Sequence, residues 1–118
     1  MELQQEVKLE GTDMENLLNN IIKHGLGDAQ ISGFGWTESG EDLWIQFILS
    51  DNTIIKLLFV WVTNLSINLD FKDYFGMPLI LDTTFKHIEN KFWGININFD
   101  AAPEGKIKFE CNDIQIVT

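Results

Sequence analysis

The chain has 118 residues, 45% of them apolar and 12% aromatic, so it is long and apolar enough to bury a core and is not disordered. Its formal net charge is −10 and it contains no arginine, which disfavours nucleic acid as a partner because phosphate backbones require a positive surface. A lone cysteine excludes an internal disulfide, and no apolar run approaches the ~20 residues of a membrane-spanning helix. We therefore expect a single domain over residues 1–118, without a membrane partner and located in a reducing cytoplasm.

The N-terminal part predicts one helix. Residues 1–10 alternate in a way typical of a short strand or an extended arm. Thr12 and Glu15 then form the spacing of a capping box, and Gly25 is a typical residue just after a helix end. Between them, apolar side chains recur at helical spacing at Met14, Leu17, Leu18, Ile21 and Ile22. We expect a helix over residues 13–24 whose apolar stripe packs on a sheet.

A hairpin follows the helix. Residues 29–36 are strand-like and include Gly33 and Gly35, which indicate a bulge or a close backbone approach. Residues 37–41 predict a hairpin loop, and residues 43–49 alternate as a second strand.

One long run of alternation predicts the centre of the sheet. Apolar residues occupy almost every odd position of residues 57–71, whereas the even positions are apolar only up to Val62. This pattern is typical of a strand that has both faces covered at its start and one face in water at its end. The helix is expected to cover the doubly apolar start. We expect a bend near Thr63 and Asn64, and we expect Trp61 to be buried in the core, with Trp61→Ala costing ~3–5 kcal/mol of stability.

The C-terminal half predicts further strands over residues 79–88, 93–99 and 107–116. In the last of these the apolar residues change from odd to even positions, which requires an extra residue, most simply a β-bulge at Asn112–Asp113. Phe109 and Ile114 are then both expected to face the core. Together the elements predict an α+β fold: a curved, antiparallel, meander-like sheet of about six to eight strands with one N-terminal helix packed on one face.

Residues suited to metal binding or nucleophilic chemistry are few and far apart. We expect His24 at the helix end, His87 half-buried on a strand and Cys111 as a small buried apolar residue. The sequence also lacks a complete glycine-rich phosphate motif. These observations predict no metal, no cofactor and no enzymatic activity.

Charge and aromatic residues instead indicate a binding surface near the first hairpin. Residues 1–50 hold nine acids and two lysines, a net charge of −7. Trp61 and Trp93 fall on apolar faces, whereas two other tryptophans flank the hairpin loop. The candidate partner contacts are three acids and three aromatic residues: Glu38, Glu41, Asp42, Trp36, Trp44 and Tyr74.

Several segments carry a resemblance to known proteins. Gly27-Asp28-Ala29-Gln30-Ile31, the strand that starts at Asp42-Leu43-Trp44-Ile45, and Ile107-Lys108-Phe109-Glu110-Cys111 resemble small acidic β-rich bacterial proteins of unknown function, some of them similar to immunity proteins of toxin systems. The resemblance implies a bacterial protein that binds another protein. We therefore expect a non-enzymatic interaction protein with a basic partner. The alternative is a small-ligand-binding domain with an apolar pocket between the helix and the sheet.

Overall fold

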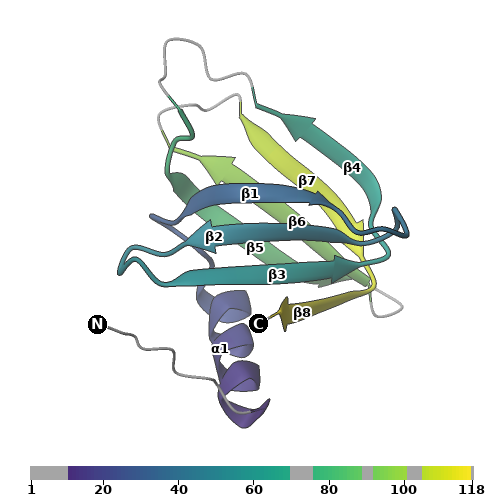
Figure 1. The fold of residues 1–118 in the computed structure, drawn as a ribbon. Coiled ribbons are helices and arrows are strands. Elements are labelled where there is room, and N and C mark those ends of the chain that lie inside the picture. Colours follow the sequence, from purple (N-terminus) through teal and green to yellow (C-terminus); the bar gives the residue numbers. More distant parts are fainter. Residues whose placement is uncertain (1–10, 70–75, 89–91, 101–104, 118) are drawn as a thin grey trace.

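The computed structural model describes residues 11–69, 76–88, 92–100 and 105–117 (Figure 1). Within them the chain forms the helix α1 (Gly11–His24) and eight strands. The strands are β1 (Gln30–Trp36), β2 (Leu43–Ile48), β3 (Ile54–Val60), β4 (Thr63–Asn68), β5 (Ile80–Ile88), β6 (Phe92–Phe99), β7 (Lys106–Cys111) and β8 (Asp113–Val117). The arm expected over residues 1–10 lies outside the described residues.

The helix has the predicted end and starts two residues earlier than predicted. The backbone N–H of Gly25 donates to the carbonyl of Ile21 at 2.7 Å, and Gly25 has a φ of 80°, a conformation that glycine adopts without steric cost. The predicted apolar stripe faces inward, with Ile21 buried and Leu17, Leu18 and Ile22 packed against the core. The helix packs mainly along β5 and β8, and β8 pairs with β3, the start of the long strand.

The strands form two four-stranded sheets, and the prediction of one meander-like sheet is wrong on this point. Sheet A has the order β1-β2-β3-β8 and sheet B the order β4-β7-β6-β5, with antiparallel pairing throughout. The sheets lie in two layers, and their strands run at a large angle to one another (Figure 1). Such sandwiches are closed at their corners by strands that pass from one sheet to the other.

Two long segments make this corner. β3 continues into β4 through Trp61 and Val62, and β7 continues into β8 through Asn112. The backbone N–H of Asn112 donates to the carbonyl of Val60 at 2.7 Å, and that of Val62 donates to the carbonyl of Glu41 at 3.0 Å. The change of sheet is therefore held by backbone hydrogen bonds on both segments.

The odd-to-even switch near the C-terminus marks this change of sheet. Phe109 and Ile114 are both buried, as predicted. The interruption at Asn112 separates strands of two different sheets, however, so it is a corner of the sandwich and not a bulge within one ladder. An interruption of one residue reverses the alternation in either case, which is why the sequence pattern could not distinguish them.

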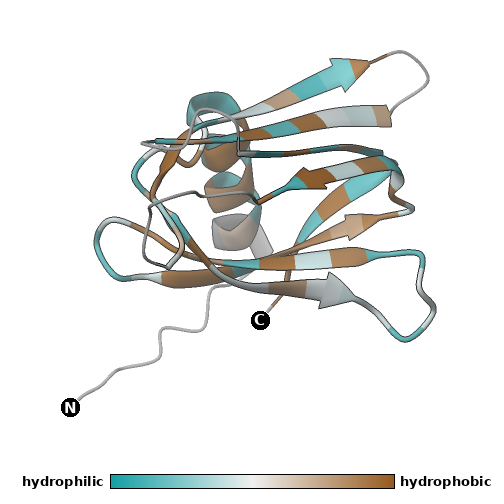
Figure 2. Cartoon of the chain, turned by 90° about the horizontal axis from the view of Figure 1, so that it is seen from above, coloured by the Kyte–Doolittle hydropathy of each residue, from teal (hydrophilic) through white to brown (hydrophobic). Residues whose placement is uncertain are grey.

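The core lies between the two sheets, and the alternation that builds it is visible along the strands in Figure 2. Phe59 of β3 and Phe109 of β7 meet edge to face, with ring centroids 4.9 Å apart. Both are almost fully buried, at 0% and 1% exposure. A further hydrogen bond links the two sheets. The N–H of Ile80, the first residue of β5, donates to the carbonyl of Ala29, just before β1, at 2.8 Å.

In and just before β5, the buried side chains do not follow one regular alternation. Leu79 and Leu81 are exposed, whereas Ile80 and Thr83 are buried. The register against β6 shifts between Ile80 and Asp82, so the alternation changes phase inside the segment. His87, expected to be half-buried, is exposed at the end of the strand.

Candidate functional site

The three predicted acids lie at one end of sheet A, in and after the loop that joins β1 to β2. The loop is closed by backbone bonds, because the N–H of Thr37 donates to the carbonyl of Asp42 at 2.9 Å and the N–H of Gly40 donates to the carbonyl of Thr37 at 2.9 Å. Glu38 and Glu41 are exposed, and Asp42 is half-buried. The loop thus projects two carboxylates into solvent.

Trp61 lies beside these acids, and the prediction that it is a core residue is wrong. Its side chain is 58% exposed and its φ is 54°, in the left-handed region that bulky residues rarely adopt. The backbone N–H of Trp61 donates to Oδ1 of Asp42 at 3.0 Å, which holds the corner in this conformation. The sequence pattern assumed one continuous strand, and the positive φ at Trp61 breaks that alternation.

Trp36 is the second exposed tryptophan of this end. It is the last residue of β1, pairs with Leu43 of β2 and is 49% exposed. Because β2 lies between β1 and β3, the start of β2 separates the two tryptophans. We call this group the Trp–acid surface; it consists of Trp36, Glu38, Glu41, Asp42 and Trp61.

Trp44 borders this surface but is more enclosed. It lies on the face of sheet A turned away from sheet B, and a Cβ atom added to Gly33 or Gly35 would be 3.3–3.5 Å from its indole ring. The two glycines thus leave space for the indole ring. The ladder is irregular between Ile31 and Gly33, in agreement with a bulge, one of the two alternatives expected there. Nζ of Lys56 lies 4.9 Å from the centroid of the same ring. Tyr74, the remaining candidate, lies outside the described residues.

Cys111 has a strongly raised pKa, which bears on whether it could act as a nucleophile. Its side chain is fully buried, as predicted. Burial, with a smaller contribution from the charge of Asp113, raises the pKa of the thiol from its ordinary value of 9.0 to about 12. A thiol that stays protonated at neutral pH is a poor nucleophile. In the described part of the chain, no three His, Cys, Asp or Glu side chains are grouped so that they could hold a metal ion.

We predict that Cys111 reacts with iodoacetamide at pH 8 roughly 1,000-fold more slowly in the folded protein than in denaturant, because the thiolate is so much rarer. The contribution of the raised pKa to stability is fully present below pH 9 and is lost as the pH rises from about 9 towards 12, because only the unfolded thiol ionises there. Mass spectrometry of alkylated samples measures the rate at which iodoacetamide modifies Cys111 in the folded protein and in denaturant. Equal rates in the two states would show that Cys111 is accessible.

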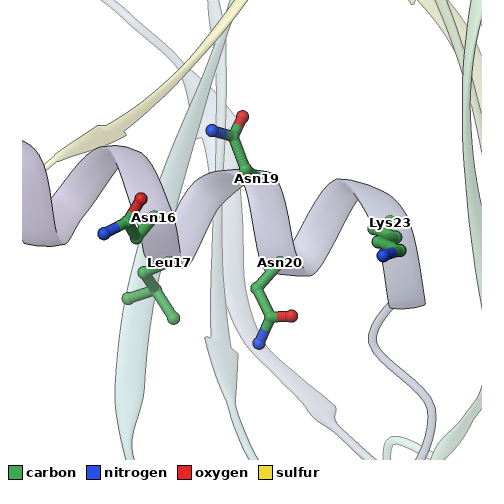
Figure 3. Close-up of a pocket in the computed structure, with 5 residues that line it drawn as sticks. All are labelled: Asn16, Leu17, Asn19, Asn20 and Lys23. Atoms are coloured by element: carbon green, nitrogen blue, oxygen red, sulfur yellow. The ribbon is translucent and has the colours of Figure 1, made fainter.

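A shallow hollow of about 470 Å³ runs along α1, lined by Asn16, Leu17, Asn19, Asn20 and Lys23 (Figure 3). Its polar side chains are exposed to solvent. This hollow differs in place and chemistry from the apolar pocket between helix and sheet of the alternative prediction. Among the described residues, no helix has the length and hydropathy needed to cross a membrane.

Comparison with known proteins yields a likeness of fold. No family model and no curated protein matches the chain. The chain is similar in structure to an uncharacterized protein from Neisseria gonorrhoeae, with a TM-score of 0.59 and 13% sequence identity. The likeness covers 78% of this chain and 92% of that protein. It shows a shared fold and carries no function to this chain.

Proposed function

We propose that this is a non-enzymatic binding protein that holds a basic partner protein through the Trp–acid surface. The observation that carries the proposal is the pair of exposed tryptophans, Trp36 and Trp61, on either side of an acidic hairpin loop. An immunity-like role in a bacterial cytoplasm is one form of this activity and agrees with the resemblance seen in the sequence.

The two residue types complement each other physically. Tryptophan is enriched among the residues that dominate protein interfaces, and a lysine or arginine over an indole ring gains ~0.5–2 kcal/mol from the cation–π interaction. Carboxylates around an interface speed the encounter with a positively charged partner and contribute less to its retention. Glu38 and Glu41 are exposed and are therefore suited to speeding the encounter with the partner. The exposed tryptophans are suited to contacting its basic side chains.

The partner can be identified by cross-linking in cells that express the protein, followed by mass spectrometry of the linked peptides. We expect cross-links from the Trp–acid surface to a protein with a basic patch. Cross-links that come only from other regions of the chain would contradict the proposal.

Once the partner is identified, we predict that Trp61→Ala lowers the affinity of this protein for it by about 30-fold. That is the effect of losing a central interface side chain. Leu81→Ala is the matched control, because Leu81 is also 58% exposed but lies on β5 of sheet B. Isothermal titration calorimetry measures both. An equal loss of affinity in the two variants would contradict a role specific to Trp61.

The acids are tested separately by the triple variant Glu38→Gln, Glu41→Gln and Asp42→Asn. Asparagine at position 42 keeps an oxygen that can accept the bond from the N–H of Trp61. We expect slower association and a weaker dependence on salt, because exposed charges are screened beyond about 8 Å at physiological ionic strength. An unchanged association rate at low salt, measured by stopped flow, would show that these acids do not steer the partner.

A further inference from the structure

β1 forms one edge of sheet A, and this edge leads directly to the Trp–acid surface. Figure 1 shows β1 as the outermost strand of the nearer layer, and among the described strands it forms a ladder with β2 alone. The backbone groups on the other side of β1 therefore form an edge that a further strand can extend. We call the stretch from Gly33 to Trp36 the β1 edge.

The hydrogen bonds to β2 show which backbone groups of the β1 edge point outward. The N–H of Thr37, directly after Trp36, donates to the carbonyl of Asp42. In an antiparallel ladder, pairs that exchange hydrogen bonds alternate with pairs that do not. Gly35 therefore bonds to β2 as Thr37 does, whereas the N–H and C=O groups of Phe34 and Trp36 point away from β2. A strand alongside them can form about four backbone hydrogen bonds.

The β1 edge lacks the features that keep most sheet edges from pairing. Natural edge strands carry charged residues or proline, are distorted by a bulge, or are covered by another element. The sequence of β1, QISGFGW, contains no charged residue and no proline. Its irregularity lies between Ile31 and Gly33, so the register from Gly33 to Trp36 is regular.

The other edge strands of the two sheets are β4, β5 and β8, and each has such a feature. The register of β4 against β7 is irregular, and Asn64 in β4 has a φ of 55°. α1 packs along β5 and β8, which also carry the charged residues Asp82 and Asp113. Among the described strands, β1 is thus the edge most open to strand addition.

The β1 edge ends where the acidic loop begins. Trp36 is 49% exposed, Phe34 is half-buried, and the exposed carboxylates of Glu38 and Glu41 follow in the loop. We propose that the partner contributes an extended segment that adds to the β1 edge as a fifth strand of sheet A, with basic residues beside Glu38 and Glu41. This inference rests on the proposed function and names the kind of segment that the Trp–acid surface binds.

The direction of the added strand sets the order of residues in the segment. All pairing in sheet A is antiparallel, and antiparallel pairs are slightly more stable per residue than parallel ones. An antiparallel segment runs from the acidic loop towards Gly33, so its basic residues precede its strand. Phe34 and Trp36 lie on one face of β1, so every second residue of that strand is apolar and packs beside them.

A synthetic peptide of this pattern is the probe: two lysines followed by five residues that alternate valine and threonine. The control peptide has the reverse order, with its lysines last. We expect the first peptide at saturation to slow hydrogen exchange of the N–H groups of Phe34 and Trp36 by at least about 10-fold, while that of Gly35, already bonded to β2, changes little. Nuclear magnetic resonance of the full chain measures exchange and affinity. The reversed peptide is expected to bind at least about 10-fold more weakly.

Three results overturn the proposal. The first is exchange of the two N–H groups that the peptide leaves unchanged at about 5 mM, and the second is equal affinity for the two peptides. The third is exchange that slows in the protein alone as its concentration rises, which would show that a second copy of the chain occupies the edge. We do not expect the third, because two copies with a net charge of −10 repel each other.

Two variants at one position separate the backbone from the side chain. Phe34→Ala and Phe34→Pro both remove the ring, and proline also removes the outward N–H without removing a bond to β2. We expect Phe34→Pro to bind the peptide about 5-fold more weakly than Phe34→Ala, the effect of one lost hydrogen bond. Equal affinities of the two folded variants overturn strand addition. The exchange measurement on the unchanged chain decides the question if Phe34→Pro does not fold.

The partner found by cross-linking separates this inference from the proposed function. We expect it to slow exchange at Phe34 and Trp36 as the peptide does. A partner that Trp61→Ala weakens, but that leaves those two N–H groups unprotected, overturns strand addition and leaves the proposed function in place. Peptide binding at the β1 edge, together with cross-links that come only from other regions, overturns the proposed function instead.

Discussion

Phe59→Ala is expected to lower the free energy of unfolding by about 3–5 kcal/mol, the largest effect that we predict for a core substitution in this chain. Phe59 is fully buried, and its ring meets that of Phe109 at a centroid distance of 4.9 Å. Because Phe59 belongs to sheet A and Phe109 to sheet B, the substitution opens a cavity between the two layers. The loss is a large fraction of the ~5–15 kcal/mol that stabilises a typical domain.

Trp61→Ala is the matched control for Phe59→Ala, since it also removes a large aromatic side chain from the same segment. Trp61 is 58% exposed, so we expect a loss below about 1 kcal/mol, far from the cost predicted for a core tryptophan. Urea denaturation, with the midpoint and slope fitted for each variant, measures both values. Equal losses for Phe59→Ala and Trp61→Ala would contradict the placement of Trp61 at an exposed corner.

Gly25→Ala is expected to destabilise the protein by about 2–5 kcal/mol, as the sum of a left-handed backbone and a steric overlap. Gly25 has a φ of 80°, and a Cβ atom added to it would lie 2.7 Å from the backbone oxygen of Thr83. That oxygen belongs to β5 and cannot move without disturbing the pairing with β6. The end of α1 would have to shift away from the sheet.

Gly40→Ala separates the two contributions. Gly40 has a φ of 76°, but nothing lies within 4 Å of an added Cβ atom. We therefore expect only the cost of the left-handed backbone, about 1–2 kcal/mol. Thermal or chemical denaturation compares the two variants. A loss for Gly25→Ala no larger than that for Gly40→Ala would show that α1 is not held closely against β5.

Much of the local structure could be predicted because side-chain periodicity reports directly on which face is buried. The helical stripe around Ile21, the alternation of β2 and β6 and the burial of Cys111 all follow from it. These segments have no irregularity between the first and the last apolar residue. The irregular ladder at Gly33 was also predictable as one of two alternatives, since a glycine within a strand often marks a bulge.

The arrangement of the sheets could not be predicted, because periodicity does not record which sheet a strand joins. The passage through Trp61 and the one through Asn112 each place one segment in two sheets. Whether buried and exposed side chains keep alternating across such a passage depends on the backbone angles there. The pattern of apolar residues does not report those angles. The same reason explains β5, where a register shift after Ile80 exposed Leu81.

The candidate site was predicted in part. The acids and Trp36 were identified from their place around the hairpin loop, whereas Trp61 was assigned to the core. One signal was present: Thr63 and Asn64 interrupt the apolar run, and asparagine tolerates the positive φ of 55° that Asn64 adopts. That interruption placed the bend correctly to within a few residues. It could not show that the bend begins at Trp61 and brings its indole to the first hairpin.

The strand order has a consequence for how the chain is made. β3 emerges from a ribosome soon after β1 and β2, but its other neighbour in sheet A is β8, which starts 53 residues beyond the end of β3 at Val60. At ~5–20 residues per second, that edge waits about 3–10 s for its partner. An unpaired strand edge is a template for another chain, and pairing between distant segments is slow. Synthesis therefore passes through a stage in which the yield of folded protein depends on β8 reaching β3 before a strand of a neighbouring chain does.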